Sequence, residues 1–147
     1  MPKKTKRKVA YSKLPMQRQL NLRHEGKYFD LQRIFDRLNE RYFRGRLRGY
    51  EVKWGRRRRH RPKEYFIFGT IQEEDRVIRI NPLLDQPFVP LWFLQYVLYH
   101  EMLHIKHRPR LINGRRIFHT AAFRADEQRF ARFKESIEWL DNLARRR

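Results

Sequence analysis

The first regular pattern of hydrophobic positions spans residues 31–43. Its apolar side chains recur at steps of three and four, the period of an amphipathic helix, and they are Leu31, Ile34, Phe35, Leu38 and Tyr42. Asp30 stands directly before this run and can accept backbone N–H groups as the N-cap, while Gly45 can end the helix. The pattern predicts a helix over 31–43 with one face toward a core.

Three short segments with strand-like patterns follow. Residues 50–54 alternate in polarity, residues 65–71 form a second apolar run that Gly69 interrupts, and residues 76–80 form a third. Asn81-Pro82 then breaks the pattern. These segments predict a small three-stranded sheet of antiparallel type.

The most apolar stretch runs over residues 90–107. Pro90 suits the first turn of a helix, and apolar side chains recur at helical spacing, namely Leu91, Leu94, Val97, Leu98, Met102 and Ile105. Lys and Arg number 36 of 147 residues, yet none occurs between Ile80 and Ile105. A segment without positive charge is suited to a buried helix that binds a cation.

A connection over residues 108–118, marked by Pro109 and Asn113-Gly114, leads to a final apolar stripe. Counted from His119, the stripe continues at steps of three and four through Phe123, Asp126, Phe130, Phe133, Ile137 and Leu140. It predicts one long helix over 120–144. Helix, three strands and two helices in this order predict an α+β domain.

Composition favours a folded domain, with 40% hydrophobic and 14% aromatic residues despite 35% charged ones. We expect this domain over residues 29–147, preceded by a flexible basic arm over 1–28. The chain has no cysteine, which excludes disulfides and cysteine-based zinc modules. No secretory signal or membrane span is visible in the sequence, so we expect an intracellular, cytoplasmic protein.

The formal net charge is +20. Part of it lies in the arm and at the end of the chain, and a cluster between two predicted strands contains Arg56, Arg57, Arg58, Arg59, Arg61 and Lys63. Such clusters are often only solvated, but charge of one sign at this density also attracts polyanions. The clustering favours DNA as a partner, with the cluster as its binding loop and association with the nucleoid as one location.

Residues 100–104 read His-Glu-Met-Leu-His. Two histidines four positions apart on a helix are separated by about 6 Å along its axis and about 40° around it, so both can bind one ion. Glu101 is placed to hold a metal-bound water and take its proton, as in zinc peptidases. The pattern predicts one Zn²⁺ per chain, with His100 and His104 as ligands and Glu101 as general base.

The third ligand must come from further along the chain, and His119 is the best candidate because it begins the stripe that faces the metal helix. His107 would lie about 10 Å along the axis from His100, too far to share the ion. Glu127 is the other candidate. Asp126 and Glu127 are also candidates to accept the free N–H of a ligand histidine, although such acids more often pair with arginine.

These motifs resemble the SprT-like zinc metallopeptidase domain, the family of SprT and Spartan. The similar segments are residues 38–43, 52–54, 78–84, 100–104 and 119–123. In that family the third ligand is the histidine of a His-Gly-x-x-Phe pattern, which maps onto His119 and Phe123. The chain departs from the family in having Thr120 in place of the glycine and in lacking a cysteine zinc ribbon.

The resemblance covers about residues 30–135 and implies a zincin-like fold and zinc-dependent hydrolysis of peptide bonds. Spartan-type members are DNA-dependent proteases that act on proteins crosslinked to DNA, so the resemblance also implies DNA as a partner beside a protein substrate. Two other functions stay open. The chain could be a basic nucleic-acid-binding protein with a structural zinc, or a metal-dependent hydrolase of a non-protein substrate.

Overall fold

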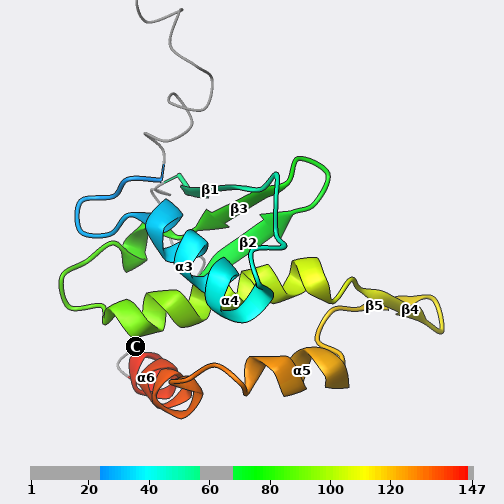
Figure 1. Cartoon of the computed structure of the whole chain (residues 1–147). Coiled ribbons are helices and arrows are strands. Elements are labelled where there is room, and N and C mark those ends of the chain that lie inside the picture. Colours follow the sequence, from blue (N-terminus) through cyan, green and yellow to red (C-terminus); the bar gives the residue numbers. More distant parts are fainter. Residues whose placement is uncertain (1–23, 57–67, 146–147) are drawn as a thin grey trace, which may run out of the picture.

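The computed structural model describes residues 24–56 and 68–145, and it shows an α+β fold, as the order of the patterns predicts (Figure 1). Its helices and strands are α3 (Leu31–Phe43), β1 (Glu51–Trp54), β2 (Gly69–Gln72), β3 (Val77–Ile80), a 3-10 turn (Pro82–Leu84), α4 (Leu91–Lys106), β4 (Arg110–Ile112), β5 (Arg115–Ile117), α5 (Ala121–Glu127) and α6 (Phe133–Arg145).

Helix α3 confirms the first prediction, including its cap. One carboxylate oxygen of Asp30 accepts the backbone N–H groups of Gln32 at 3.0 Å and Arg33 at 3.4 Å. The helix ends where Arg44 adopts a left-handed conformation, with Gly45 in the same region. Its apolar face is buried through Leu31, Ile34, Phe35, Leu38 and Phe43.

The three-stranded sheet is mixed, with strand order β1-β3-β2. Strands β2 and β3 are antiparallel, but β1 and β3 are parallel, so the expected antiparallel sheet is wrong for one of its two strand pairs. A sheet in chain order would have β2 in the centre. Here β3, with three of its four residues buried in the core, takes the centre, and β1 pairs with it in parallel. Chain order alone does not decide which strand lies in the middle. Residues 65–67 of the second predicted strand lie outside the described residues.

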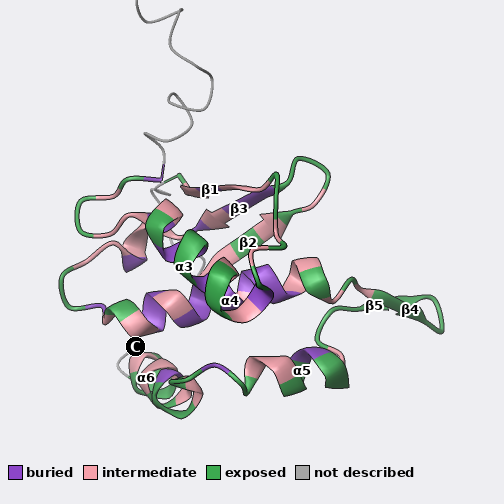
Figure 2. Cartoon of the chain, in the orientation of Figure 1, coloured by how far each residue is buried: buried purple, intermediate pink, exposed green. Residues whose placement is uncertain are grey.

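Helix α4 is buried between two layers. The sheet covers one side, α5 and α6 lie on the other, and α3 packs alongside (Figure 1). Figure 2 shows purple, buried positions along most of α4. They include Phe93, Leu94, Leu98, Met102 and Leu103. A helix that is apolar on nearly all sides needs such cover on more than one face.

The single long helix expected over 120–144 is wrong, because the chain breaks between α5 and α6. Phe130 lies at the break, 5% exposed, and its ring stacks on Tyr99 with centroids 5.4 Å apart. The hydroxyl of Tyr42 accepts the backbone N–H of Ala131 at 3.1 Å. These contacts with α3 and α4 hold the chain in a turn where its local pattern favours a continuous helix.

The break allows α5 and α6 to pack on different parts of α4. Helix α5 lies beside the half that carries the histidines, and α6 lies beside the half that begins the helix (Figure 1). Trp139 of α6 packs on Phe93 of α4, with ring centroids 4.2 Å apart. A straight helix would extend away from one of these two contacts.

The predicted connection over 108–118 forms a hairpin of strands β4 and β5. Asn113 and Gly114 make its turn with positive φ angles of 51° and 76°. Asn-Gly is a typical pair for a two-residue hairpin turn, since both positions require a left-handed backbone. The hairpin projects from the rest of the molecule (Figure 1).

Residues 24–30 form a turn that Asp85 holds. The Asp85 carboxylate accepts the backbone N–H groups of Lys27 at 2.6 Å, Tyr28 at 2.9 Å and Phe29 at 3.2 Å. The last five residues of the expected arm thus contact the domain, and residues 1–23 lie outside the described ones. In the described part of the chain, no helix is long and apolar enough to cross a membrane.

Replacing Phe130 with alanine tests the role of the break. We expect the free energy of unfolding to fall by about 3–5 kcal/mol, because the change leaves a cavity among three aromatic rings. Phe88→Ala is the control: its ring is 67% exposed, so its removal should cost about 0.5 kcal/mol or less. Urea denaturation measures both. A fall for Phe130→Ala no larger than that of the control would show that this ring does not hold the turn.

Candidate metal centre

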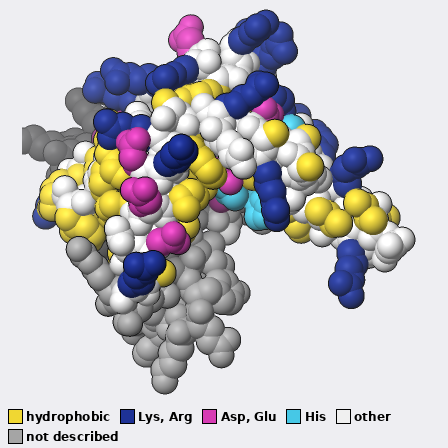
Figure 3. Space-filling model, turned by 90° about the horizontal axis from the view of Figure 1, so that it is seen from below, with side chains coloured by type: hydrophobic (Ala, Val, Ile, Leu, Met, Phe, Trp, Pro, Cys, Tyr) yellow, Lys and Arg dark blue, Asp and Glu magenta, His cyan; other side chains and the backbone are white. Residues whose placement is uncertain are grey.

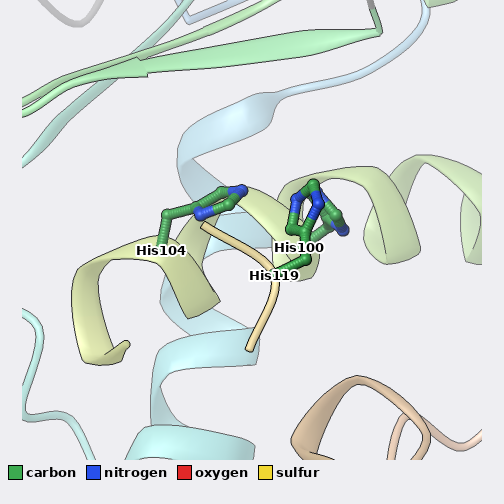
Figure 4. Close-up of side chains that lie close together, drawn as sticks. All are labelled: His100, His104 and His119. Carbon is green, nitrogen blue, oxygen red and sulfur yellow. The ribbon is translucent and has the colours of Figure 1, made fainter. Parts of the chain in front are cut away.

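Three histidines converge at one place in the structure. His100 and His104 lie on α4, and His119 lies directly before α5 (Figure 4). One nitrogen from each ring lies within 4.8 Å of the other two, close enough for one metal ion. The ring centroids are 5.0 Å apart in every pair. The three residues predicted as metal ligands are therefore brought together.

The hairpin and the start of α5 position His119. After α4 ends, the chain runs out along β4, returns along β5 and places His119 opposite the last turns of α4. Thr120 then caps α5, its hydroxyl accepting the backbone N–H of Phe123 at 3.2 Å. The residue that departs from the family pattern thus begins the helix with a standard cap.

The ring of Phe123 packs against all three imidazoles. It is 1% exposed, and its ring centroid lies 5.1 Å from His100, 4.7 Å from His104 and 5.0 Å from His119. An apolar ring at this position excludes water from one side of the cluster. It also limits how far each imidazole can rotate.

Glu127 orients the first of the histidines. Its carboxylate lies 2.5 Å from Nδ1 of His100, which leaves Nε2 of that ring for a metal. Tyr96 hydrogen-bonds to Glu127, and burial followed by this carboxylate raises the pKa of Tyr96. Glu127 is not in the three-histidine group; it lies beside His100, and His119 takes the third position of the group.

Asp126 serves a different histidine. Its carboxylate lies 2.6 Å from Nε2 of His107 and 2.7 Å from Nζ of Lys106. Burial acts to raise the pKa of Asp126, but hydrogen bonds from Lys106 and His107 outweigh it and lower the pKa. The hydroxyl of Tyr99 donates to the backbone carbonyl of Asp126 at 2.6 Å. His107, which sequence spacing places too far from the ion, lies outside the metal group.

Two of the three imidazoles are held in the form that binds metals. Burial, followed by the nearby His100 and His119, lowers the pKa of His104 to about 4. Burial and His100 also lower the pKa of His119. A neutral imidazole offers a free lone pair, whereas a protonated one does not. Three imidazole nitrogens that converge without a carboxylate suit a divalent transition-metal ion.

Glu101 lies beneath the edge of the sheet. It is 7% exposed, and burial raises its pKa to about 7 although His100 acts in the opposite direction. Gly69 of β2 passes directly over it: a Cβ at this position would lie 3.1 Å from Cγ of Glu101 and 3.0 Å from Cδ1 of Ile80. The glycine therefore permits a close approach of strand and carboxylate.

The sequence pattern leaves the roles of three residues in this region open. Gly69 interrupts a strand pattern, and glycine in a strand often marks close backbone approach, which is the one signal that could have found it. Tyr96 and Glu127 come from separate helices, and nothing in their spacing pairs them. Of the predicted DNA loop, Arg56 is exposed after β1, and the other five basic residues lie outside the described residues.

Comparison with models of known families and with curated proteins finds no match to this chain. The SprT-like resemblance therefore depends on the residues quoted above.

His119→Ala tests the three-histidine group. Two imidazoles bind a divalent ion far more weakly than three, so we expect one equivalent of bound zinc in the parent chain and loss of that zinc after dialysis in the variant. His107→Ala is the matched control, because this ring bonds Asp126 and lies outside the group. Elemental analysis gives the stoichiometry. Equal zinc in His119→Ala and the parent would contradict the assignment.

Glu127→Ala tests the partner of His100. Removal of a carboxylate that orients a ligand ring typically weakens metal binding by about 10–100-fold. We expect a change of this size in a competition titration with a chromogenic chelator, with the stoichiometry still one per chain. Glu135→Ala serves as control, since this glutamate is exposed on α6 and pairs with Arg132. An unchanged affinity would mean that Glu127 has no influence on the metal.

Proposed function

We propose that this chain is a zinc-dependent metallopeptidase of the SprT-like type. The observation that carries the proposal is the group of three histidines with Glu101 next to one of them on the same buried helix. Three protein ligands leave a fourth coordination position open, as catalytic zinc sites do, whereas structural sites usually fill all four with side chains. Among the described residues the group contains no fourth ligand, which favours catalysis over a structural zinc.

Zinc bound there would act as a Lewis acid that polarises the scissile carbonyl and lowers the pKa of a water. Glu101 takes the proton of the attacking water and passes it to the leaving amine. Glu127, by its bond to Nδ1 of His100, would leave Nε2 of that ring to hold the metal, and the buried ring of Phe123 excludes water from one side of the cluster. Each of these roles falls to a side chain of α4 or α5.

The sheet supplies a position for an extended substrate. Strand β2 is at one end of the order β1-β3-β2, so among the described residues its outer edge has no strand partner. A polypeptide that pairs with this edge would run past Gly69, directly above Glu101. Strand addition depends on main-chain hydrogen bonds and gives weak sequence preference. A small mixed sheet over a helix with two histidine ligands is the zincin-like arrangement that we propose here.

DNA is the partner that the charge favours. A net charge of +20 on 147 residues attracts a polyanion. We therefore propose that the enzyme acts inside the cell on protein substrates that lie near DNA. A hydrolase of nucleic acid or of another non-protein substrate is the alternative. Casein cleavage with and without DNA, beside nicking of a plasmid, separates the two functions.

Glu101→Gln tests the catalytic assignment. Glutamine keeps the shape of the side chain but cannot accept a proton, and removal of a general base typically costs about 10²–10⁴ in rate. We expect casein cleavage to fall by this factor while zinc content and the unfolding midpoint change little. Glu40→Gln, at an exposed position of α3, should cleave at the parent rate. Cleavage by Glu101→Gln at a rate near that of the parent would show that another group is the base.

A further inference from the structure

The β4–β5 hairpin exposes an unusual mixture of side chains. It carries large hydrophobic residues on the surface, with Leu111 73% and Ile112 46% exposed. In its register every cross-strand pair joins an arginine to an aliphatic residue, namely Arg110 with Ile117, Leu111 with Arg116, and Ile112 with Arg115. Figure 3 shows these yellow and blue side chains side by side on the projecting arm.

The arginines of the hairpin are not neutralised. Among residues 24–56 and 68–145, no carboxylate lies within 4.0 Å of the charged nitrogens of Arg110, Arg115 or Arg116, although Arg108, Arg129 and Arg132 do pair with acids. Leaving three such charges together on a narrow ribbon costs mutual repulsion, which an anionic partner relieves. Charge complementarity therefore indicates a polyanion.

The placement of the arginines on both faces narrows the choice of partner. Opposite residues of an antiparallel pair share a face and neighbours along a strand alternate, so Arg110 and Arg115 lie on one face and Arg116 on the other. A flat protein surface would cover only one face. A groove with a phosphate wall on each side would engage both.

The dimensions and the tip also favour a groove. Two strands spaced about 4.8 Å apart, each about 10 Å long, form a ribbon that fits the major groove of B-DNA, about 12 Å wide. A membrane anchor would carry its apolar side chains at the tip, whereas the tip here is Asn113-Gly114. Aliphatic side chains between the arginines can contact thymine methyl groups and sugars.

We propose that the β4–β5 hairpin is a duplex-binding element that enters a groove of DNA, with Arg110, Arg115 and Arg116 on the phosphates. This extends the DNA association of the proposed function and gives it a surface. The hairpin leads into the metal centre, because Phe118 at its base lies 6.3 Å from the His104 ring, centroid to centroid. A duplex held by the hairpin therefore lies beside the metal site.

The test uses the full chain with Glu101→Gln and bound zinc, and it measures binding to a fluorescent 20-base-pair duplex by anisotropy over a series of salt concentrations. Replacing Arg110, Arg115 and Arg116 with serine should reduce the slope of log affinity against log salt by about 0.9 for each phosphate that the protein no longer neutralises, so by up to about three units. The matched control removes the same charge from exposed positions elsewhere, Arg37, Arg46 and Arg48, and should change the slope by less than one unit.

Three results would overturn the proposal. The first is an equal fall in slope for both triple variants, which would mean that only net charge matters. The second is an unchanged slope for the hairpin variant. The third concerns the hairpin variant: if it binds the duplex as tightly as the parent but no longer binds vesicles of phosphatidylserine and phosphatidylcholine, a membrane is the partner.

Two further measurements keep the test decisive. If the triple variant loses zinc or unfolds, the single variants Arg115→Ser and Arg116→Ser, on opposite faces, should each reduce the slope by about one unit; no change in either would overturn the proposal. Leu111→Thr removes an aliphatic group while keeping strand propensity and charge, so it should weaken duplex binding about 3–10-fold with the slope unchanged. Anisotropy does not require catalysis, so a failure of the peptidase assignment leaves this result intact.

Discussion

The burial of α4 between two layers is the constraint on which the rest of the structure depends. The sheet and the C-terminal helices remove its apolar side chains from water, and this burial extends to the turn that carries His100 and Glu101. Polar groups in such surroundings need partners or they are costly. Burial also lowers the pKa of His104 to about 4, which leaves this imidazole neutral and available to a metal.

Helix α5 meets that requirement with two consecutive acids. Glu127 bonds His100, and Asp126 bonds His107 almost two turns further along α4. The two bonds fix both the rotation and the position of α5 against the metal helix. Because His119 stands next to Thr120, the N-cap of α5, these contacts also place the third candidate ligand. The aromatic cluster around Phe130 then turns the chain so that α6 can cover the remaining half of α4.

Positive charge is sparse along the helix that carries His100 and His104, although Arg124 of α5 acts to lower the pKa of His119. No lysine or arginine occurs between residues 80 and 105, the segment that contains most of the metal helix. The arginines of the hairpin project away from the body of the molecule (Figure 3). A cation near a ligand would weaken metal binding, and the effect falls with distance and solvent screening. One chain can therefore combine a candidate site for a dication with a strongly basic surface.

The sequence by itself determined the features that depend on neighbours along the chain. These are the capped helix at Leu31–Phe43, the three strands, the buried helix at Leu91–Lys106 and the spacing of His100 and His104, because helix and strand periods follow from local geometry. The central place of β3, the break at Phe130 and the choice of Glu127 rather than Asp126 as the partner of His100 were decided only by the tertiary structure. Each of these depends on which surface packs against which, and contacts between residues far apart in the chain leave no period in the sequence. His119 stands between the two cases: the stripe predicted it as the third ligand on a continuous helix that the structure breaks, and only the fold brought it to the other two rings.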